Sequence, residues 1–173
     1  KPMWLNDPQK LWSLLYELVA CPSFSGSRNE LDMAQKIHSI VAGFSYFKNN
    51  PAHLQLHAIA NDKFDRCFVA ALLKGQGKNT VVLLHHHDVV DTDDYGAYRE
   101  YAFSPDKITE ILRTAALPEK ARQDMDSNQW LFGRGVMDMK AGAALQIALL
   151  HDFSASGNFT GNILLLSVPG EES

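Results

Sequence analysis

The first apolar pattern along the chain has the spacing of an amphipathic helix. Within residues 6–23, leucines recur every three or four positions, which places them on one face of a helix. Asn6 or Asp7 can act as the N-cap, and Pro8 falls in the first turn, where its missing N–H is harmless. The pattern predicts a helix that Pro22 ends.

Two further segments have helical character. Residues 27–44 open with Ser27 and Glu30 at the spacing of a capping box and continue with an apolar stripe of helical period. Residues 138–153, DMKAGAALQIALLHDF, combine helix-forming and small residues, which would allow a close approach to a sheet. Both segments are predicted to cover the strands described next.

Four segments have the pattern of β-strands. Residues 53–60 alternate polar and apolar side chains, as expected for a half-buried strand. Residues 66–75, 79–87 and 161–168 are instead nearly continuous apolar runs bounded by Gly, Asn, Asp or Pro. Continuous runs of this kind are typical of central strands that are covered on both faces.

A long segment without strand character separates the third and fourth predicted strands. Residues 91–129, called the excursion below, carry many charges and contain one short helical candidate within residues 104–123. The order of helices and strands predicts an α/β fold with a mixed sheet covered by helices on both faces.

Composition narrows the possible partners. The 173 residues are 46% hydrophobic, and the net charge is −4, without a basic stripe, which argues against nucleic acid or an anionic membrane as a partner. The longest apolar run, FVAALL, is far shorter than a membrane span. Cys21 and Cys67 lack a CxxC context, which predicts reduced thiols and favours the cytoplasm.

Polar residues follow two of the buried strands. His86 and Asp88 come after VVLL, and Glu171 and Glu172 come after ILLLSV, while Asp138 lies between a glycine-flanked turn and a predicted helix. In open α/β sheets, ligands bind outside the carboxyl ends of the strands. One imidazole and several carboxylates suit a divalent ion such as zinc, so we expect a metal site there.

The three consecutive histidines are not equivalent. Residues two apart on a strand point the same way, so Asp88 can orient His86, while His85 and His87 point to the opposite face. The flanking histidines are therefore predicted to be packing or rim residues. Taken alone, HHH also fits a polar strand end, and EE alone fits two solvated glutamates; only their combination favours a metal site.

Three motifs carry a resemblance to a known family. The segments LLHHHDVVD, LFGRGVMDMKAGAALQIAL and ILLLSVPGEES resemble the N-terminal motifs of the di-zinc metallopeptidases and deacylases of clan MH. That family includes aminoacylase, acetylornithine deacetylase, succinyl-diaminopimelate desuccinylase and glutamate carboxypeptidase. The long excursion and WLFGRGVMDMKAG resemble its arginine-utilisation branch. Two positions depart from the usual pattern: His85 replaces a small residue, and Gly170 often has an acidic counterpart.

The resemblance implies a role for each site residue. His86 would ligate one metal ion, Asp138 would bridge two, and Glu172 would ligate the other. Glu171 would be the general base, and Asp88 would orient His86. The implied cofactors are two zinc ions, with cobalt or manganese as substitutes.

The resemblance also implies two features of the backbone. A cis peptide bond is expected between Asp138 and Met139. Glu171 and Glu172 would point in opposite directions on an extended chain, so a bend after Pro169 is needed to bring both to the site, and Gly170 can supply it.

The implied function is hydrolysis of an amide bond in a peptide or N-acyl amino acid by water that two metal ions activate. On this interpretation residues 1–173 are the N-terminal portion of a zinc-exopeptidase-like catalytic domain, which is incomplete and by itself inactive. Further ligands and a lid domain, which could form a homodimer, would lie downstream. The alternative is a non-catalytic, metal-binding or regulatory homologue. The acidic loop 91–94 suits either a basic substrate or, more simply, a solvated turn.

Overall fold

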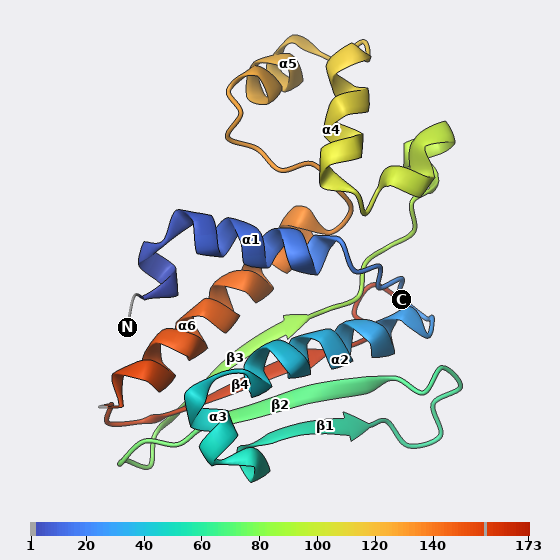
Figure 1. The fold of residues 1–173 in the computed structure, drawn as a ribbon. Coiled ribbons are helices and arrows are strands. Elements are labelled where there is room, and N and C mark those ends of the chain that lie inside the picture. Colours follow the sequence, from blue (N-terminus) through green and yellow to red (C-terminus); the bar gives the residue numbers. More distant parts are fainter. Residues whose placement is uncertain (1–2, 158) are drawn as a thin grey trace.

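A four-stranded sheet forms the base of the molecule in the computed structural model, which describes residues 3–157 and 159–173 (Figure 1). The strand order is β1-β2-β4-β3; β1 pairs with β2 and β2 with β4 antiparallel, whereas β3 and β4 are parallel. The strands are β1 (Leu54–Ala58), β2 (Cys67–Leu73), β3 (Thr80–His86) and β4 (Asn162–Val168). The predicted mixed sheet of an α/β fold is thus confirmed.

Six α-helices and four 3-10 or π-helical turns accompany the sheet in the described residues. The helices are α1 (Pro8–Val19), α2 (Asn29–Ala42), α3 (Ser45–Asn49), α4 (Pro105–Thr114), α5 (Glu119–Asp126) and α6 (Gly142–Ser156). The turns are η1 (Trp4–Asn6), η2 (Pro51–His53), η3 (Asp93–Tyr101) and η4 (Val136–Ala141). No helix in the described part of the chain is both long and apolar enough to cross a bilayer.

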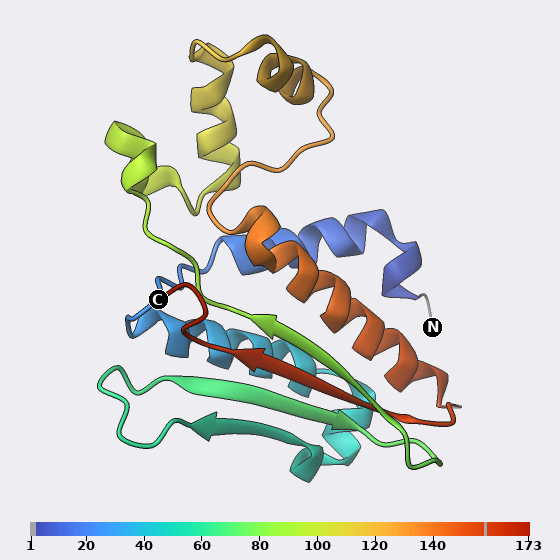
Figure 2. The same cartoon turned by 180° about the vertical axis from the view of Figure 1, so that it is seen from behind.

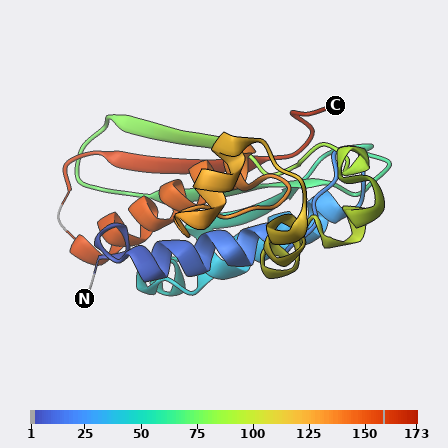
Figure 3. The same ribbon diagram turned by 90° about the horizontal axis from the view of Figure 1, so that it is seen from above.

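The helices α1, α2 and α6 lie over the same face of the sheet (Figure 3). Alternate residues of β2 and β4, such as Val69 and Leu165, point into the core beneath them. The opposite face differs from the prediction that helices cover both faces: Val82 and Leu84 of β3 keep 52% and 56% of their surface exposed. A continuous apolar run indicates that both faces of a strand can be buried. Within the described residues, however, helices cover only one face of the sheet.

The predicted start of the first helix is confirmed. The Asp7 side chain accepts a hydrogen bond from the Lys10 amide at 3.1 Å, and Pro8 occupies the first turn. The capping box before α2 forms in part: Glu30 reaches back to the Ser27 amide at 3.4 Å. These local bonds fix where two of the sheet-covering helices begin.

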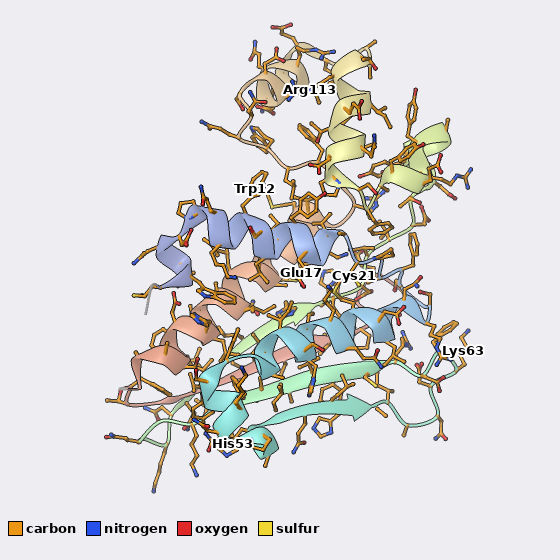
Figure 4. All side chains as sticks on the ribbon, in the orientation of Figure 1. Trp12, Glu17, Cys21, His53, Lys63 and Arg113 are labelled. Atoms are coloured by element: carbon orange, nitrogen blue, oxygen red, sulfur yellow. The ribbon has the colours of Figure 1, made fainter. Side chains whose placement is uncertain are left out.

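The excursion projects away from the sheet and contains two helices, α4 and α5, instead of the single one predicted (Figures 1 and 2). Pro118 explains the break, since proline cannot continue the preceding helix. Arg122 of α5 donates to the carbonyls of Arg113 and Ala115 at 2.9 and 2.6 Å, which satisfies acceptors at the end of α4. Figure 4 shows Arg113 within this projecting part and Trp12 on α1 below it.

The topology places the candidate residues at one edge. In the parallel pair, His86 of β3 lies opposite Val168 of β4, so the residues that follow both strands emerge side by side. The amide of His87 donates to the Val168 carbonyl at 2.9 Å and extends the pairing beyond β3.

Candidate metal centre

His86 and the carboxylates singled out in the sequence lie together at the carboxyl ends of β3 and β4. His86 Nε2 lies 3.0 Å from Asp138 Oδ1 and 3.8 Å from Glu171 Oε2. One ligand atom from each of His86, Glu171 and Glu172 lies within 4.8 Å of the others. The residues come from three segments far apart in the sequence.

Hydrogen bonds to both ring nitrogens orient His86. Nδ1 lies 3.0 Å from the main-chain carbonyl oxygen of Asp88, and Nε2 faces Asp138. The resemblance implied orientation by Asp88, and the structure assigns the hydrogen bond to its carbonyl; the nearest carboxylate oxygen is 3.5 Å from Nδ1. An imidazole that faces acceptors on both sides must carry two protons or share Nε2 with a cation.

The carboxylate of Asp88 is instead bonded to the other half of the site. Its oxygens accept hydrogen bonds from the amides of Glu172 and Glu171, at 2.9 and 3.2 Å, and the residue is fully buried. Burial opposes ionisation, but the hydrogen bonds that the carboxylate accepts, with these two amides as the largest contributors among them, lower the pKa of Asp88 below its ordinary value. Asp88 therefore contacts both His86 and the segment that bears the glutamates.

A turn after β4 brings both glutamates to this edge. Gly170 has φ +77°, a conformation that glycine adopts without strain, so the predicted bend is present. A Cβ atom at this position would lie 2.8 Å from Nη1 of Arg66. An acidic residue here, as the family often has, would need Arg66 to move.

Asp138 is presented by the loop that the sequence GRGVMD forms, residues 133–138, called the glycine loop below. Gly135 has φ +74°, and its carbonyl accepts the Lys140 amide at 2.9 Å. The Lys140 side chain is buried, donates to the Cys21 carbonyl at 2.8 Å and anchors the loop from beneath. This burial lowers the pKa of Lys140 to about 8. The peptide bond between Asp138 and Met139 is cis, as the resemblance implied.

The two flanking histidines are packing residues, as predicted. Both are buried; His85 Nδ1 is 2.8 Å from Gln146 Oε1, and His87 Nδ1 is 2.9 Å from Ser167 Oγ. Burial lowers the pKa of His85 to about 4 and that of His87 to about 3. Both rings are therefore neutral near pH 7.

The electrostatics of the cluster suit a divalent cation. Burial and the neighbouring Asp138 carboxylate raise the pKa of Glu172, although His86 opposes this. Burial alone would lower the pKa of His86, but its hydrogen bonds to Asp138 and Asp88 raise it. Crowded carboxylates around one imidazole form a donor set that accepts zinc, so the residues present fit the implied metal.

Sequence reasoning missed a polar network beneath the site. Glu30, predicted only as a helix cap, is fully buried, and its carboxylate accepts from the Gly26 amide at 2.7 Å and from Arg66 Nη1 at 3.4 Å. Burial, together with the nearby Asp88 charge, raises the pKa of Glu30. The capping-box spacing signalled a helix start but not that Arg66, 36 residues away, would lie against it.

Comparison with known proteins places this geometry in context. Residues 82–173 match the model of peptidase family M20/M25/M40. The chain is 40% identical to the uncharacterized protein YqjN of Bacillus subtilis (strain 168) over 166 residues, and 33% identical to protein RocB of the same organism over 172 residues. These alignments cover 94% and 98% of the chain but 30% of each relative.

Solved structures share the fold at low sequence identity. A metallo-carboxypeptidase from Sulfolobus solfataricus, Sso-CP2, superimposes with a TM-score of 0.66 at 18% identity, over 94% of this chain and 31% of that one. The dipeptidase Dug1p from Saccharomyces cerevisiae gives 0.63 at 17% identity, over 95% of this chain and 33% of that one. The chain thus spans about a third of the length of the proteins that it resembles.

Proposed function

Because the chain belongs to peptidase family M20/M25/M40, we propose that the protein is a metal-dependent hydrolase that cleaves an amide bond in a peptide or an N-acyl amino acid. The observation that carries the proposal is the convergence of His86 with the carboxylates of Asp138, Glu171 and Glu172 at one sheet edge. The family match covers the segment that contains all four residues.

The proposed roles follow the chemistry of each side chain. His86 would ligate one metal ion, Glu172 would ligate a second, and Asp138 would be shared by both. Zinc is the proposed metal, with cobalt or manganese as substitutes. Such ions, when bound, lower the pKa of water and polarise the scissile carbonyl. Glu171, exposed beside His86, accepts the proton of the attacking water and delivers it to the leaving amine.

Other parts of the site are proposed to lie outside this chain. Catalytic zinc usually has three protein ligands, and His86, Asp138 and Glu172 are too few for two ions. Since the chain covers 30% of its curated relatives, we propose that it is the first portion of the catalytic domain. The remaining ligands and a lid domain, through which two copies associate, would follow. The free thiols of Cys21 and Cys67 favour action in the cytoplasm.

Matched substitutions of the two adjacent glutamates test the proposal in the full-length protein. Glu171→Gln should retain bound zinc but lower kcat for amide hydrolysis by at least roughly 100-fold, because a general base is lost. Glu172→Gln should lose metal as well as turnover. Zinc content is measured by mass spectrometry and turnover by amine release, with Glu119→Gln on α5 as the control.

Two results would decide against parts of the proposal. Unchanged turnover in Glu171→Gln would exclude this residue as the base, and unchanged zinc content in Glu172→Gln would exclude it as a ligand. A wild-type protein that binds zinc but cleaves no amide would favour the alternative, a non-catalytic metal-binding homologue.

A further inference from the structure

A cavity of about 570 Å³ opens between the excursion and the segment that leads into the glycine loop. Its size lies within the range of small-molecule sites, which is about 300–1,000 Å³. Residues of η3 and α4 form one side of the cavity, and residues 130–137 form the other. The excursion, which the proposed metal chemistry does not use, thus builds a pocket.

This pocket adjoins the candidate metal centre. A second cavity, of about 360 Å³, is lined by Asp138 and Glu172. The two cavities share Gly133, Val136 and Met137 of the glycine loop. The glycine loop therefore forms a common wall, and the larger pocket is the direct neighbour of the space beside Asp138 and Glu172.

The lining of the pocket is aromatic and aliphatic. Tyr95, Tyr98, Trp130 and Phe132 contribute rings, and Trp130 keeps 52% of its surface exposed. Aliphatic side chains fill the remainder: Ile108, Leu112, Leu131, Val136 and Met137. Exposed apolar groups that gather in one concave place mark a binding surface more often than a structural one.

The charged groups at the pocket neutralise each other. Asp94 is the one carboxylate in the lining within the described residues, and it forms an ion pair with Arg134. The Arg134 guanidinium also lies over the Tyr95 ring, 5.2 Å from its centroid. Asp94 therefore does not offer an unpaired charge to a basic ligand.

The rest of the acidic loop is also locally satisfied. The Asp91 side chain accepts from the Asp93 amide at 3.0 Å, and Asp93 lies 3.8 Å from Arg99. This arrangement favours a solvated turn over a cation site. The pocket therefore offers a ligand mainly its aromatic and aliphatic side chains.

A main-chain hydrogen bond fixes the pocket relative to the metal centre. The Arg134 amide donates to the Ala102 carbonyl at 2.8 Å, and Ala102 is fully buried. This bond joins the end of η3 to the glycine loop. The position of the aromatic residues is thereby linked to that of Asp138.

We propose that this pocket binds a large apolar group, aromatic or branched aliphatic, that flanks the scissile amide of the substrate. This inference rests on the proposed function and gives it a substrate class. The excursion then determines which substrates fit. Because Asp94 is paired with Arg134, the pocket offers no unpaired charge to a charged substrate group.

Matched dipeptides test the proposal on the full-length, zinc-loaded protein. The ratio of kcat/KM is measured for Phe-Gly against Ala-Gly and for Gly-Phe against Gly-Ala. We expect one pair to favour phenylalanine by roughly tenfold or more, since buried apolar groups discriminate by such factors. Trp130→Ala, and separately Tyr98→Ala, should reduce that ratio at least threefold, because each substitution removes an aromatic ring from the pocket lining.

Phe153→Ala is the matched control, because Phe153 on α6 is an aromatic residue with 41% of its surface exposed and lies outside the lining of this pocket and of the cavities beside it. It should leave the ratio unchanged. Wild-type protein that cleaves both peptides of each pair equally would overturn the pocket proposal while the proposed function stands. A ratio that neither pocket substitution changes would overturn it as well.

A protein that cleaves no dipeptide or N-acyl amino acid would contradict the proposed function. In that case, binding of a small aromatic amide tests the pocket proposal separately. Calorimetric titration with 3-phenylpropionamide should give a dissociation constant at least fivefold lower for the wild type than for Trp130→Ala. Equal constants, or no detectable binding to the wild type, would overturn the inference.

Discussion

Asp88 illustrates how one residue can join two halves of a site. Its carbonyl oxygen accepts from His86 Nδ1, and its carboxylate accepts the amides of Glu171 and Glu172. The pair of amides requires two acceptor oxygens, which an ionised carboxylate has and an amide side chain lacks. The acidic character of this position is therefore explained by the chain's own geometry.

Replacing Asp88 with Asn should weaken both halves together. One of the two glutamate amides would face a donor, which should lower the free energy of unfolding by about 1–3 kcal/mol. Because partners of ligands affect metal binding by roughly 10–100-fold, zinc affinity should fall within that range. Urea unfolding and competition with a chelating dye measure the two effects.

Asp91→Asn is the matched control for this substitution. Asp91 lies in the same loop but accepts one main-chain hydrogen bond, from Asp93, which an Asn side chain can also accept. Zinc affinity in Asp88→Asn equal to that of the control would contradict the positioning role.

The directions of the three histidine side chains were predicted correctly, because the alternation of a strand alone determines them. The alternation of a strand separated His86 from His85 and His87, and the structure buries the two flanking rings against Gln146 and Ser167. Periodicity gives the direction of a side chain but not its partner. It therefore could not show that His86 bonds to the carbonyl rather than to the carboxylate of Asp88.

At the scale of elements, the sequence predicted where the strands lie along the chain but not the order in which they pair. Apolar runs located β2, β3 and β4, and the polar residues after β3 and β4 marked the edge where they meet. The strand order depends on pairings between segments far apart in sequence, which no local pattern records. The break between α4 and α5 was missed although Pro118 signalled it.

An ion pair in the turn between β1 and β2 makes the stability of the fold depend on pH. Asp62 accepts from Arg66 Nε and Nη2 at 2.8 and 2.6 Å, and this pairing lowers the pKa of Asp62 to about 2. A folded-state pKa below the unfolded value contributes stability that is complete above about pH 4 and lost as the pH falls toward 2.

Asp62→Asn should therefore destabilise the protein at pH 7 and have little effect near pH 2. The difference between the urea midpoints of wild type and variant, measured from pH 7 down to 2, should shrink through the interval between about 4 and 2. Asp65→Asn, whose carboxylate forms an exposed pair with Arg28, provides the comparison. A difference that stays constant with pH would show that ionisation of Asp62 does not stabilise the fold.

At the scale of the whole molecule, the sheet has one covered and one open face in the described residues. The apolar side chains Val82 and Leu84 on the open face belong to an edge strand, β3, which has one neighbour, β4. Exposed apolar edge strands promote association between chains. The 173-residue chain produced alone should therefore self-associate through this face.

Two matched substitutions of leucine by lysine test this expectation. Leu84→Lys on the open face should raise the fraction of monomer in the 173-residue chain, measured by light scattering over a concentration series. Leu145→Lys on α6 replaces a leucine that is 52% exposed, close to the 56% of Leu84, and should change the fraction little. Equal gains in both variants would indicate a general effect of charge instead of association through the sheet.

The parallel pairing of β3 with β4 also sets a timetable for biosynthesis. His86 is made 86 residues before Glu172, and the strand that carries the glutamates must dock beside β3 before the cluster exists. At about 5–20 residues per second, the ribosome needs roughly 4–17 seconds to cover that interval. Through this time Glu172 is missing beside His86, so the cluster is complete only after Glu172 has left the exit tunnel.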